Sequence, residues 1–446
     1  MVRVRFAPSP TGYLHIGNAR AALINYLYAL RQGGEFILRI DDTDLERSKP
    51  EYEESIYKDF EWLGISYSKS FRQSERFDRY NLVRDALIAS GRLYPCYETP
   101  EELDFKRKRQ MAKGQPPIYD RAALSLTNSE KAAFEAEGRK PHWRFKLDHE
   151  PIIWNDMVRG EVRFDGAQLS DPVLIRADGV FLYSICSVVD DIDYAITHII
   201  RGEDHVTNTA TQIQLFKAVN GEKDFPVTFA HTTLLMDEDG KGLSKRLGSL
   251  SLGQMRDFGV EPMAIACLLA RLGTSLPVEP LLSLEDLGSS FDLSIFSRTP
   301  PRFSEKDLWA LNHKLYHLMP FSQMQQRLSI AGFGDFTQNH WHAVHDNIER
   351  LKDLKPWHDI FFGEIQGTCQ DHEFLKTALS LLPPTPWNET TWGTWTQTIK
   401  ETTGRKGKEL FMPLRQALTA MDHGPEMKAL LPLIGVEKVK SRLLLD

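Results

Sequence analysis

Hydrophobic and polar residues alternate with two different periods in the first 45 residues of the chain. Residues 2–6 alternate between apolar side chains and arginine, which is typical of a strand with one buried face. A stretch rich in proline, 7–12, predicts a loop, and from Gly17 to Gly33 apolar residues recur at helical spacing. Residues 36–40 are a second apolar run. The pattern predicts a β-α-β unit, and the free N–H groups at its helix N-terminus could bind a phosphate.

The pattern changes after this unit. Residues 98–138 are polar and helix-like, and alternating stretches between 141 and 182 surround a turn at Asp178. We interpret this region as an α+β insertion. Strand character is expected again over 192–200, and a helix over 207–219.

Beyond about residue 302 the pattern is helical. Apolar residues from Trp341 to Phe361 predict one face of a single long helix, with Asn339 as its N-cap. Further helices are expected over 374–382, 410–420 and 425–433. The C-terminal third is therefore predicted to be a helical module.

Composition favours a globular protein of about three domains. The 446 residues are 41% hydrophobic and 10% aromatic, which excludes disorder as the main state. No apolar run approaches the ~18 residues of a membrane span, and no secretory signal is recognisable. The four cysteines form no CxxC pair. We expect a cytosolic protein without a membrane anchor or a disulfide framework.

Charge is distributed unevenly along the chain. The formal net charge is −7, and residues 311–446 contribute nothing to it, because they contain 15 basic and 15 acidic residues. A non-specific nucleic-acid binder is usually basic overall, so this composition disfavours that class. A shaped RNA requires only local basic patches and stays compatible with the chain.

Two motifs carry candidate chemistry. His15-Ile-Gly17-Asn18 stands where the first helix is predicted to begin, and a glycine and an imidazole there suit a triphosphate. Lys241-Gly-Leu-Ser244-Lys245 is a glycine-containing basic loop that suits a phosphate whose charge grows as a bond breaks. Each motif alone is also compatible with a structural cap or a solvated turn, and the pair on either side of an insertion is more specific.

The residues at 5–18 resemble the HIGH signature of class I aminoacyl-tRNA synthetases, and those at 242–246 resemble their KMSKS loop. Further segments are similar to bacterial-type glutamyl-tRNA synthetases, namely those at 38–47, 188–191, 197–205, 414–418 and 424–426. The similarity follows the whole chain in order.

The resemblance implies an α/β Rossmann-type catalytic domain with an α+β insertion, followed by an all-α anticodon-binding region. The implied domains are a catalytic domain of residues 1–77 and 183–236, an acceptor-end-binding insertion of 78–182, a KMSKS and stem-contact region of 237–305, and an anticodon-binding region of 306–446.

The activity implied by the resemblance is that of a glutamate–tRNA ligase. ATP would activate L-glutamate as glutamyl-adenylate, and the glutamyl group would pass to the 3′-terminal adenosine of tRNA(Glu); whether tRNA(Gln) is also charged stays open. Mg²⁺ is expected with ATP, and the family default is a monomer. The implied catalytic residues are His15, Gly17 and Lys245, and the ATP-binding residues are His15, Gly17, Asn18, Lys241, Ser244 and Lys245.

The resemblance also assigns residues to glutamate, namely Arg5, Ser9, Asp41, Tyr183 and Arg201. It does not place the residues that read the anticodon. The candidates for tRNA are chosen as basic patches of the neutral helical module, namely Arg350, Lys352, Arg405 and Lys406. For Arg201 an alternative role is an ion pair with Glu203 or Asp204.

Two departures from the family pattern concern the loop and zinc. Gly242 stands where the loop usually opens with lysine, and Lys241 precedes it. Zinc-binding relatives carry a Cys-x-Cys pair and a later Cys/His pair in the insertion, whereas here Cys96 is followed by Glu98 and residues 119–125 contain neither Cys nor His. We expect no zinc and no other protein-bound metal.

Three alternatives remain. Glutaminyl-tRNA synthetases have a first motif closer to Pro-Glu-Pro-Asn-Gly than the Pro-Ser-Pro-Thr-Gly at 8–12. A short paralogue that glutamylates a tRNA base lacks an anticodon module. A non-catalytic tRNA-binding regulatory paralogue would not need His15 or Lys245. The histidines at 313, 317, 340, 342 and 345 are interpreted as structural or solvated helix residues, because no ligand spacing is recognisable around them.

Overall fold

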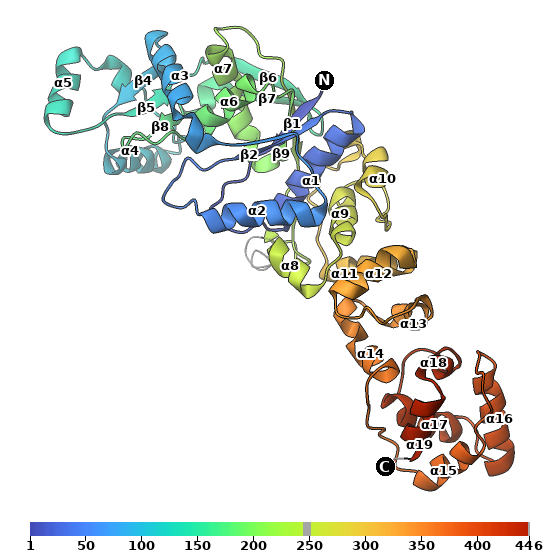
Figure 1. Ribbon diagram of the computed structural model, residues 1–446. Coiled ribbons are helices and arrows are strands. Elements are labelled where there is room, and N and C mark those ends of the chain that lie inside the picture. Colours follow the sequence, from blue (N-terminus) through green and yellow to red (C-terminus); the bar gives the residue numbers. More distant parts are fainter. Residues whose placement is uncertain (244–250, 445–446) are drawn as a thin grey trace. The chain divides into compact units, whose positions relative to one another are not determined.

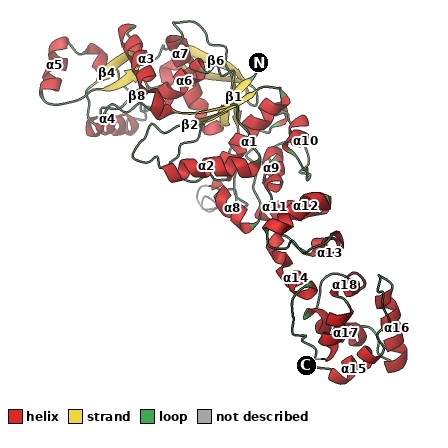
Figure 2. Ribbon diagram, in the orientation of Figure 1, coloured by secondary structure: helices red, strands yellow, loops and turns green. Residues whose placement is uncertain are grey.

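A computed structural model describes residues 1–243 and 251–444, which form two units. Unit 1 comprises residues 1–257 and 265–304, and unit 2 comprises 258–264 and 305–446. Strands occur in unit 1, while the described part of unit 2 is helical (Figures 1 and 2). None of the helices within the described ranges is long and apolar enough to cross a membrane.

The predicted β-α-β unit is confirmed. Strands β1 (Arg3–Phe6), β2 (Glu35–Ile40) and β3 (Lys69–Arg72) form a parallel sheet in the order β1-β2-β3. Helix α1 (Ile16–Arg31) connects the first two strands and α2 (Pro50–Leu63) the next two. Apolar residues of α1 at helical spacing are buried, which is why the 3.6-residue period predicted it.

A second sheet continues beside β1. Its order is β7-β6-β10-β9, with β9 and β10 parallel. The backbone N–H of Thr197 donates to the Arg3 carbonyl at 2.9 Å, so β9 begins next to β1. The strands are β6 (Pro151–Asp156), β7 (Gly160–Asp165), β9 (His198–Gly202) and β10 (Thr228–Thr232).

Helices α6 (Tyr183–Asp193) and α7 (Val206–Val219) flank β9 in the sequence. The expected helix at 207–219 is confirmed, whereas strand character from residue 192 is wrong. Ile192 still belongs to α6, and Ala195 has a positive φ of 51° in the turn before the strand. The apolar residues of this turn pack on the hydrophobic core without pairing with a strand. The spacing of apolar residues cannot distinguish such a turn from a strand.

The insertion contains the predicted mixture of helices and strands. A three-stranded antiparallel sheet has the order β4-β5-β8. Thr99 and Thr127 cap α4 and α5, each reciprocated by a glutamate three residues later. The elements are α3 (Phe77–Ala89), β4 (Leu93–Cys96), α4 (Pro100–Ala112), α5 (Asn128–Ala136), β5 (His142–Phe145) and β8 (Val173–Ile175).

One hydrophobic core joins this region to the Rossmann strands. Tyr80, Phe145, Trp154, Ile185 and Phe229 are buried members of the same cluster, although they come from five different elements. The core therefore fixes α6 and β9, which carry site residues, against the insertion. The described chain continues with three short helices, α8 (Leu252–Phe258), α9 (Pro262–Arg271) and α10 (Leu284–Ser289).

Unit 2 confirms the predicted helical module but not its single long helix. The segment 338–361 is divided into α13 (Gln338–Val344), two 3₁₀ turns, η7 (His345–Asn347) and η8 (Leu351–Leu354), and α14 (Lys355–Phe361). The N-cap of α13 is Thr337 and not Asn339. The other helices are α11 (Glu305–Leu318), α12 (Phe321–Ile330), α15 (His372–Ser380), α16 (Thr391–Thr403), α17 (Lys408–Thr419), α18 (Met427–Ile434) and α19 (Val436–Leu444).

Candidate active site

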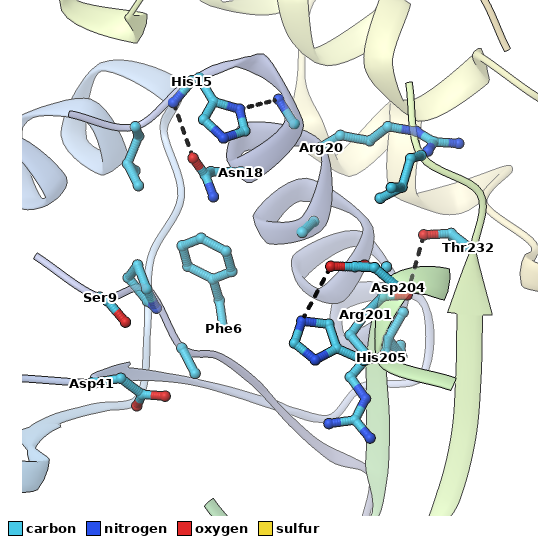
Figure 3. A pocket seen from close by; sticks show the side chains of 18 of the residues that line it. Phe6, Ser9, His15, Asn18, Arg20, Asp41, Arg201, Asp204, His205 and Thr232 are labelled. Atoms are coloured by element: carbon cyan, nitrogen blue, oxygen red, sulfur yellow. Dashed lines mark hydrogen bonds and ion pairs between the residues drawn. The ribbon is translucent and has the colours of Figure 1, made fainter. Parts of the chain in front are cut away.

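A cavity of about 630 Å³ lies where β1 and β9 end and α1 begins. Ligands in open α/β sheets bind at the carboxyl ends of the strands, so the place agrees with the fold. Figure 3 shows His15 and Asn18 at one end of the cavity and Asp41 and Arg201 towards the other. The predicted residues that line it are Arg5, Ser9, His15, Gly17, Asn18, Asp41, Tyr183 and Arg201.

His15 is the N-cap of α1. Its Nδ1 accepts a hydrogen bond from the Gly17 backbone N–H at 3.0 Å, and its own backbone N–H donates to Asn18 Oδ1 at 3.1 Å. Burial lowers the pKa of His15, so the neutral imidazole is favoured. Because Nδ1 is an acceptor, the neutral ring carries its proton on Nε2, where it can donate to a ligand oxygen.

Gly17 is required by the imidazole that folds over it. A Cβ at this position would lie 2.9 Å from His15 Cε1 and 3.1 Å from His15 Nδ1. Any side chain would push the ring out of its capping position. The resemblance assigned this glycine to the approach of ATP, and the structure adds this second reason for it.

Arg201 is a buried guanidinium surrounded by neutral partners. It donates to the Tyr183 hydroxyl at 2.8 Å, to Thr209 Oγ1 at 2.5 Å and to Gln212 Oε1 at 2.7 Å. In the described part of the chain it has no ion pair with a carboxylate, and burial lowers its pKa. Glu203, proposed as an alternative partner, instead pairs with Arg159 at 2.7 Å. The ion-pair alternative for Arg201 is therefore wrong.

Tyr183 extends the same donor set. Its oxygen accepts from Arg201, which leaves the hydroxyl hydrogen available to a ligand in the cavity. Tyr183 is the first residue of α6, so the helix start fixes its side chain beside β9. The structure thus brings Tyr183 and Arg201, two of the residues implied for glutamate, into contact.

Arg5 and Asp41 are held in a buried ionic network. Arg5 binds Asp191 with two hydrogen bonds of 3.0 and 3.2 Å, and Arg39 also donates to Asp191 at 3.0 Å. Arg39 binds Asp41 at 2.6 and 3.2 Å. Burial nevertheless raises the pKa of Asp41 to about 6, with Arg39 acting in the opposite direction. The charge of Arg5 is thus compensated within the protein, unlike that of Arg201.

Sequence reasoning missed the residues that hold this network. Asp191 and Arg39 lie in the segments 188–191 and 38–47, for which the resemblance implies no role of these two residues. Both are charged residues inside apolar stretches that became α6 and β2, which is a usable signal for buried ion pairs. Arg20 gives the same signal on the buried face of α1, where it donates to the carbonyls of Thr233 and Leu272 at 2.5 and 3.0 Å.

The second motif is only partly described. Ser244 and Lys245 lie outside the described residues. The Lys241 backbone N–H donates to Asp237 Oδ1 at 2.7 Å and closes a turn, and its side chain is exposed. Lys241 is not among the residues that line the cavity.

The four tRNA candidates differ in their surroundings. Arg350 lies 3.5 Å from Asp353 and covers the Trp309 ring, and Arg405 pairs with Asp371 at 2.6 Å. Lys352 and Lys406 are exposed. Lys406 lines a groove of about 190 Å³ in unit 2, which also contains Thr396, Gln397, Lys400, Gly407, Leu410 and Phe411.

The insertion contains hydrogen-bonded side chains where zinc-binding relatives place their first thiols. Burial raises the pKa of the Cys96 thiol to about 12, so the thiolate that zinc requires is disfavoured. The Tyr119 hydroxyl donates to Glu98 Oε1 at 2.8 Å, and Lys106 lies 3.3 Å from the same oxygen. One protonated thiol, a phenol and a paired carboxylate do not fit a structural zinc ion.

Comparisons with known proteins agree with this geometry. A family model described as "tRNA synthetases class I (E and Q), catalytic domain" matches residues 1–310, and one described as "Anticodon binding domain" matches residues 316–444. Glutamate–tRNA ligase 1 of Maricaulis maris is 53% identical over 444 residues, which cover 99% of both chains. The glutamate–tRNA ligase of Azospirillum brasilense is 53% identical over 443 residues, or 99% of this chain and 98% of its own.

A solved structure is similar over the same length. It is the crystal structure of a glutamate tRNA ligase from Elizabethkingia meningosepticum in complex with its amino acid. Its TM-score is 0.86 at 27% sequence identity, and the match covers 99% of this chain and 98% of that chain.

Proposed function

The chain belongs to the class I tRNA synthetases of the glutamate and glutamine type, and from this premise we propose that it is the ligase that joins L-glutamate to tRNA(Glu). The family uses ATP, an amino acid and tRNA. The relatives at about half identity over the full length are glutamate–tRNA ligases, which favours glutamate over glutamine. We further propose a cytosolic monomer, as expected for this family.

The proposed reaction has two steps and no covalent enzyme intermediate. The glutamate α-carboxylate attacks the α-phosphate of ATP and displaces pyrophosphate, and the acyl group then passes to the terminal ribose of the tRNA. Catalysis rests on positioning and on stabilisation of charge. We infer that Nε2–H of His15 donates to a phosphate oxygen, because His15 lines the cavity and its Nδ1 is occupied by the Gly17 N–H. Lys245 is proposed for the same role on the loop, with Lys241 and Ser244 as further ATP contacts.

Magnesium enters this scheme with ATP. Of the described residues, two carboxylates line the cavity, Asp41 and Asp204. Asp41 is bound by Arg39, whereas the Asp204 side chain is 55% exposed. Oxygen ligands suit Mg²⁺, so Asp204 would be the residue to contact an ion carried by the phosphates.

The observation that carries the choice of glutamate is the uncompensated charge of Arg201. A buried guanidinium without a carboxylate partner is costly, and an anionic ligand beside it removes the cost. The hydrogen bonds of Arg201 within the protein leave one Nη1 hydrogen for such a ligand. The glutamate side chain supplies such a carboxylate, and glutamine does not. We propose that Arg201 and Tyr183 bind the side-chain carboxylate and that Asp41 binds the ammonium group, with Arg5 and Ser9 completing the pocket.

The experiment is tRNA-dependent pyrophosphate exchange with glutamate and with glutamine. We expect wild type to prefer glutamate by roughly 10²–10⁴ in kcat/KM, because glutamine leaves a buried charge unpaired. Arg201→Gln should remove most glutamate activation and narrow the ratio between the two amino acids. Arg159→Gln, which removes a partly exposed arginine of the turn between β6 and β7, is the matched control and should keep the ratio.

Two results would contradict the proposal. Equal loss for both amino acids in Arg201→Gln would show that Arg201 supports the fold without selecting the substrate. A complete lack of exchange in the folded wild-type protein, with either amino acid, would favour a regulatory tRNA-binding paralogue.

A further inference from the structure

A cluster of imidazoles in unit 2 surrounds one carboxylate, far in sequence from the residues assigned to catalysis. Helix α11 supplies His313 and His317 one turn apart, and η7 supplies His345 and Asp346. The ring centroids of His317 and His345 are 4.8 Å apart. One ligand atom from each of His317, His345 and Asp346 lies within 4.8 Å of the other two.

Hydrogen bonds fix which nitrogen of His317 faces the carboxylate. His313 Nδ1 lies 2.8 Å from the Ile348 carbonyl and must donate to it, so the neutral His313 ring has its lone pair on Nε2. His317 Nε2 lies 3.1 Å from that lone pair and is the donor. His317 Nδ1 is then an acceptor in the neutral ring, yet it lies 3.1 Å from Asp346 Oδ1.

His345 lies against the same carboxylate oxygen. Its Nδ1 is buried without a hydrogen-bond partner, although it lies against the same oxygen of Asp346. Two imidazole nitrogens therefore converge on one carboxylate oxygen, and the neutral ring of His317 has no hydrogen to donate to it. A cation between these atoms would remove that repulsion.

Contrary to the expectation from sequence spacing, we propose that His317, His345 and Asp346 bind a divalent transition-metal ion, with His313 as a positioning residue for His317. Imidazole nitrogens with one carboxylate suit zinc and its neighbours better than Mg²⁺ or Ca²⁺. Metal-binding histidines usually donate their other N–H to an acceptor. For His317 this acceptor is Nε2 of His313, which is held in turn by its hydrogen bond to the Ile348 carbonyl.

The site differs from the thiol site of zinc-binding relatives. It is in unit 2, lacks sulfur ligands and is partly open, because the side chains of His317 and Asp346 are 36% and 64% exposed. Water would complete the coordination. Donor atoms of a tetrahedral zinc ion lie about 3.3 Å apart, so small side-chain rotations close the set. The bound ion would connect the end of α11 to the turn after α13, two segments joined here by side chains.

The test uses the untagged full-length chain after removal of metal by a chelator. Zn²⁺ is titrated by calorimetry, and Co²⁺ by its visible absorption, which reports nitrogen and oxygen coordination. We expect one ion per chain and a higher melting temperature with Zn²⁺. His345→Gln and Asp346→Asn should each abolish this binding. His313→Phe should weaken it about 10–100-fold, as expected for a residue that orients a ligand.

His372→Gln is the matched control, since His372 is an exposed histidine of the same unit. It should bind Zn²⁺ as wild type does. Circular dichroism of the metal-free variants checks that each is folded. Wild type that binds no Zn²⁺ would overturn the proposal. It would also be overturned if His345→Gln and Asp346→Asn, folded as wild type, kept the ion, because the ion would then belong to another place.

Discussion

Two arginines on neighbouring strands differ in what balances their charge. Arg5 is paired with Asp191 inside the protein, whereas the partners of Arg201 are hydroxyl, amide and imidazole groups. Burial removes water from both guanidinium groups, which costs free energy. Only for Arg5 does an ion pair within the protein offset this cost without a ligand. Of these two arginines, Arg201 is therefore the one whose stabilisation depends on a bound anion.

The raised pKa of Asp41 lets us predict how glutamate activation depends on pH. Burial raises its pKa to about 6. Below that pH the carboxyl is protonated and can no longer attract the ammonium group of glutamate; above it the carboxylate is present. We expect kcat/KM for glutamate in pyrophosphate exchange to fall about tenfold per pH unit below 6, as required for the loss of one ionised group.

The control for this prediction is Asp41→Asn, which cannot ionise. Its activity should be low, and its kcat/KM should not fall further through an apparent pKa near 6. Circular dichroism at each pH separates loss of activity from unfolding. If the mutant and wild type show the same acid limb, the titrating group is not Asp41.

At the scale of residues, the sequence indicated which residues line the cavity but not which groups neutralise their charges. His15, Asp41 and Arg201 were recognised from local motifs and do line it. The partner that neutralises Arg5 comes from another segment, because Arg5 donates to Asp191 across 186 positions. Such pairs depend on tertiary packing, which neither spacing nor propensity encodes.

At the scale of elements, His15 has two functions that can be separated. It caps α1 through Nδ1 and leaves Nε2–H for a ligand. Asparagine is among the best N-cap residues but is too short to replace the imidazole Nε2. We predict that His15→Asn keeps the melting temperature near that of wild type while adenylate formation falls about 10²–10³-fold, the cost of one lost transition-state donor.

Two variants serve as comparisons. His15→Ala should lose the same activity and also about 0.5–2 kcal/mol of stability, because the cap is gone. Thr127→Ala removes the cap of α5 and should cost stability without the loss of adenylate formation. A His15→Asn protein as active as wild type would assign His15 to the cap alone.

The wrong prediction for 338–361 shows a limit of periodicity. The apolar residues from Trp341 to Phe361 do share a buried environment, as their spacing indicated. They reach it from several short elements, because the backbone is extended at Ile348 and Arg350 and helix α14 begins with a proline in its first turn. Asp346, Asn347 and Pro356 are the residues that could have predicted the interruption.

At the scale of the whole molecule, the chain passes between the two units more than once. Residues 258–264 belong to unit 2, although the segments before and after them belong to unit 1. Within unit 2 the Glu261 backbone N–H donates to Asn312 Oδ1 at 2.6 Å, and its carboxylate pairs with Arg327. A protein ending at Ser304 would therefore keep the catalytic core but expose these groups of residues 258–264.

This organisation predicts the result of removing unit 2 after Ser304. The remaining chain keeps the sheets, the hydrophobic core and the cavity of about 630 Å³, so we expect it to fold with a modestly lower melting temperature. Charging of tRNA should nevertheless weaken, because the truncated protein lacks one of the two regions that bind the tRNA. Two linked binding regions contribute about 10²–10⁴-fold in avidity. The loss should therefore appear mainly as a higher KM for tRNA.

Lys406→Ala in the full chain should raise the KM for tRNA by a small part of this increase. Lys376→Ala is the control and should leave the KM unchanged, because Lys376 is paired with a glutamate on α15. Unchanged kcat/KM for full-length tRNA in the truncated protein would show that unit 1 alone recognises the tRNA, and would remove unit 2 from the binding surface.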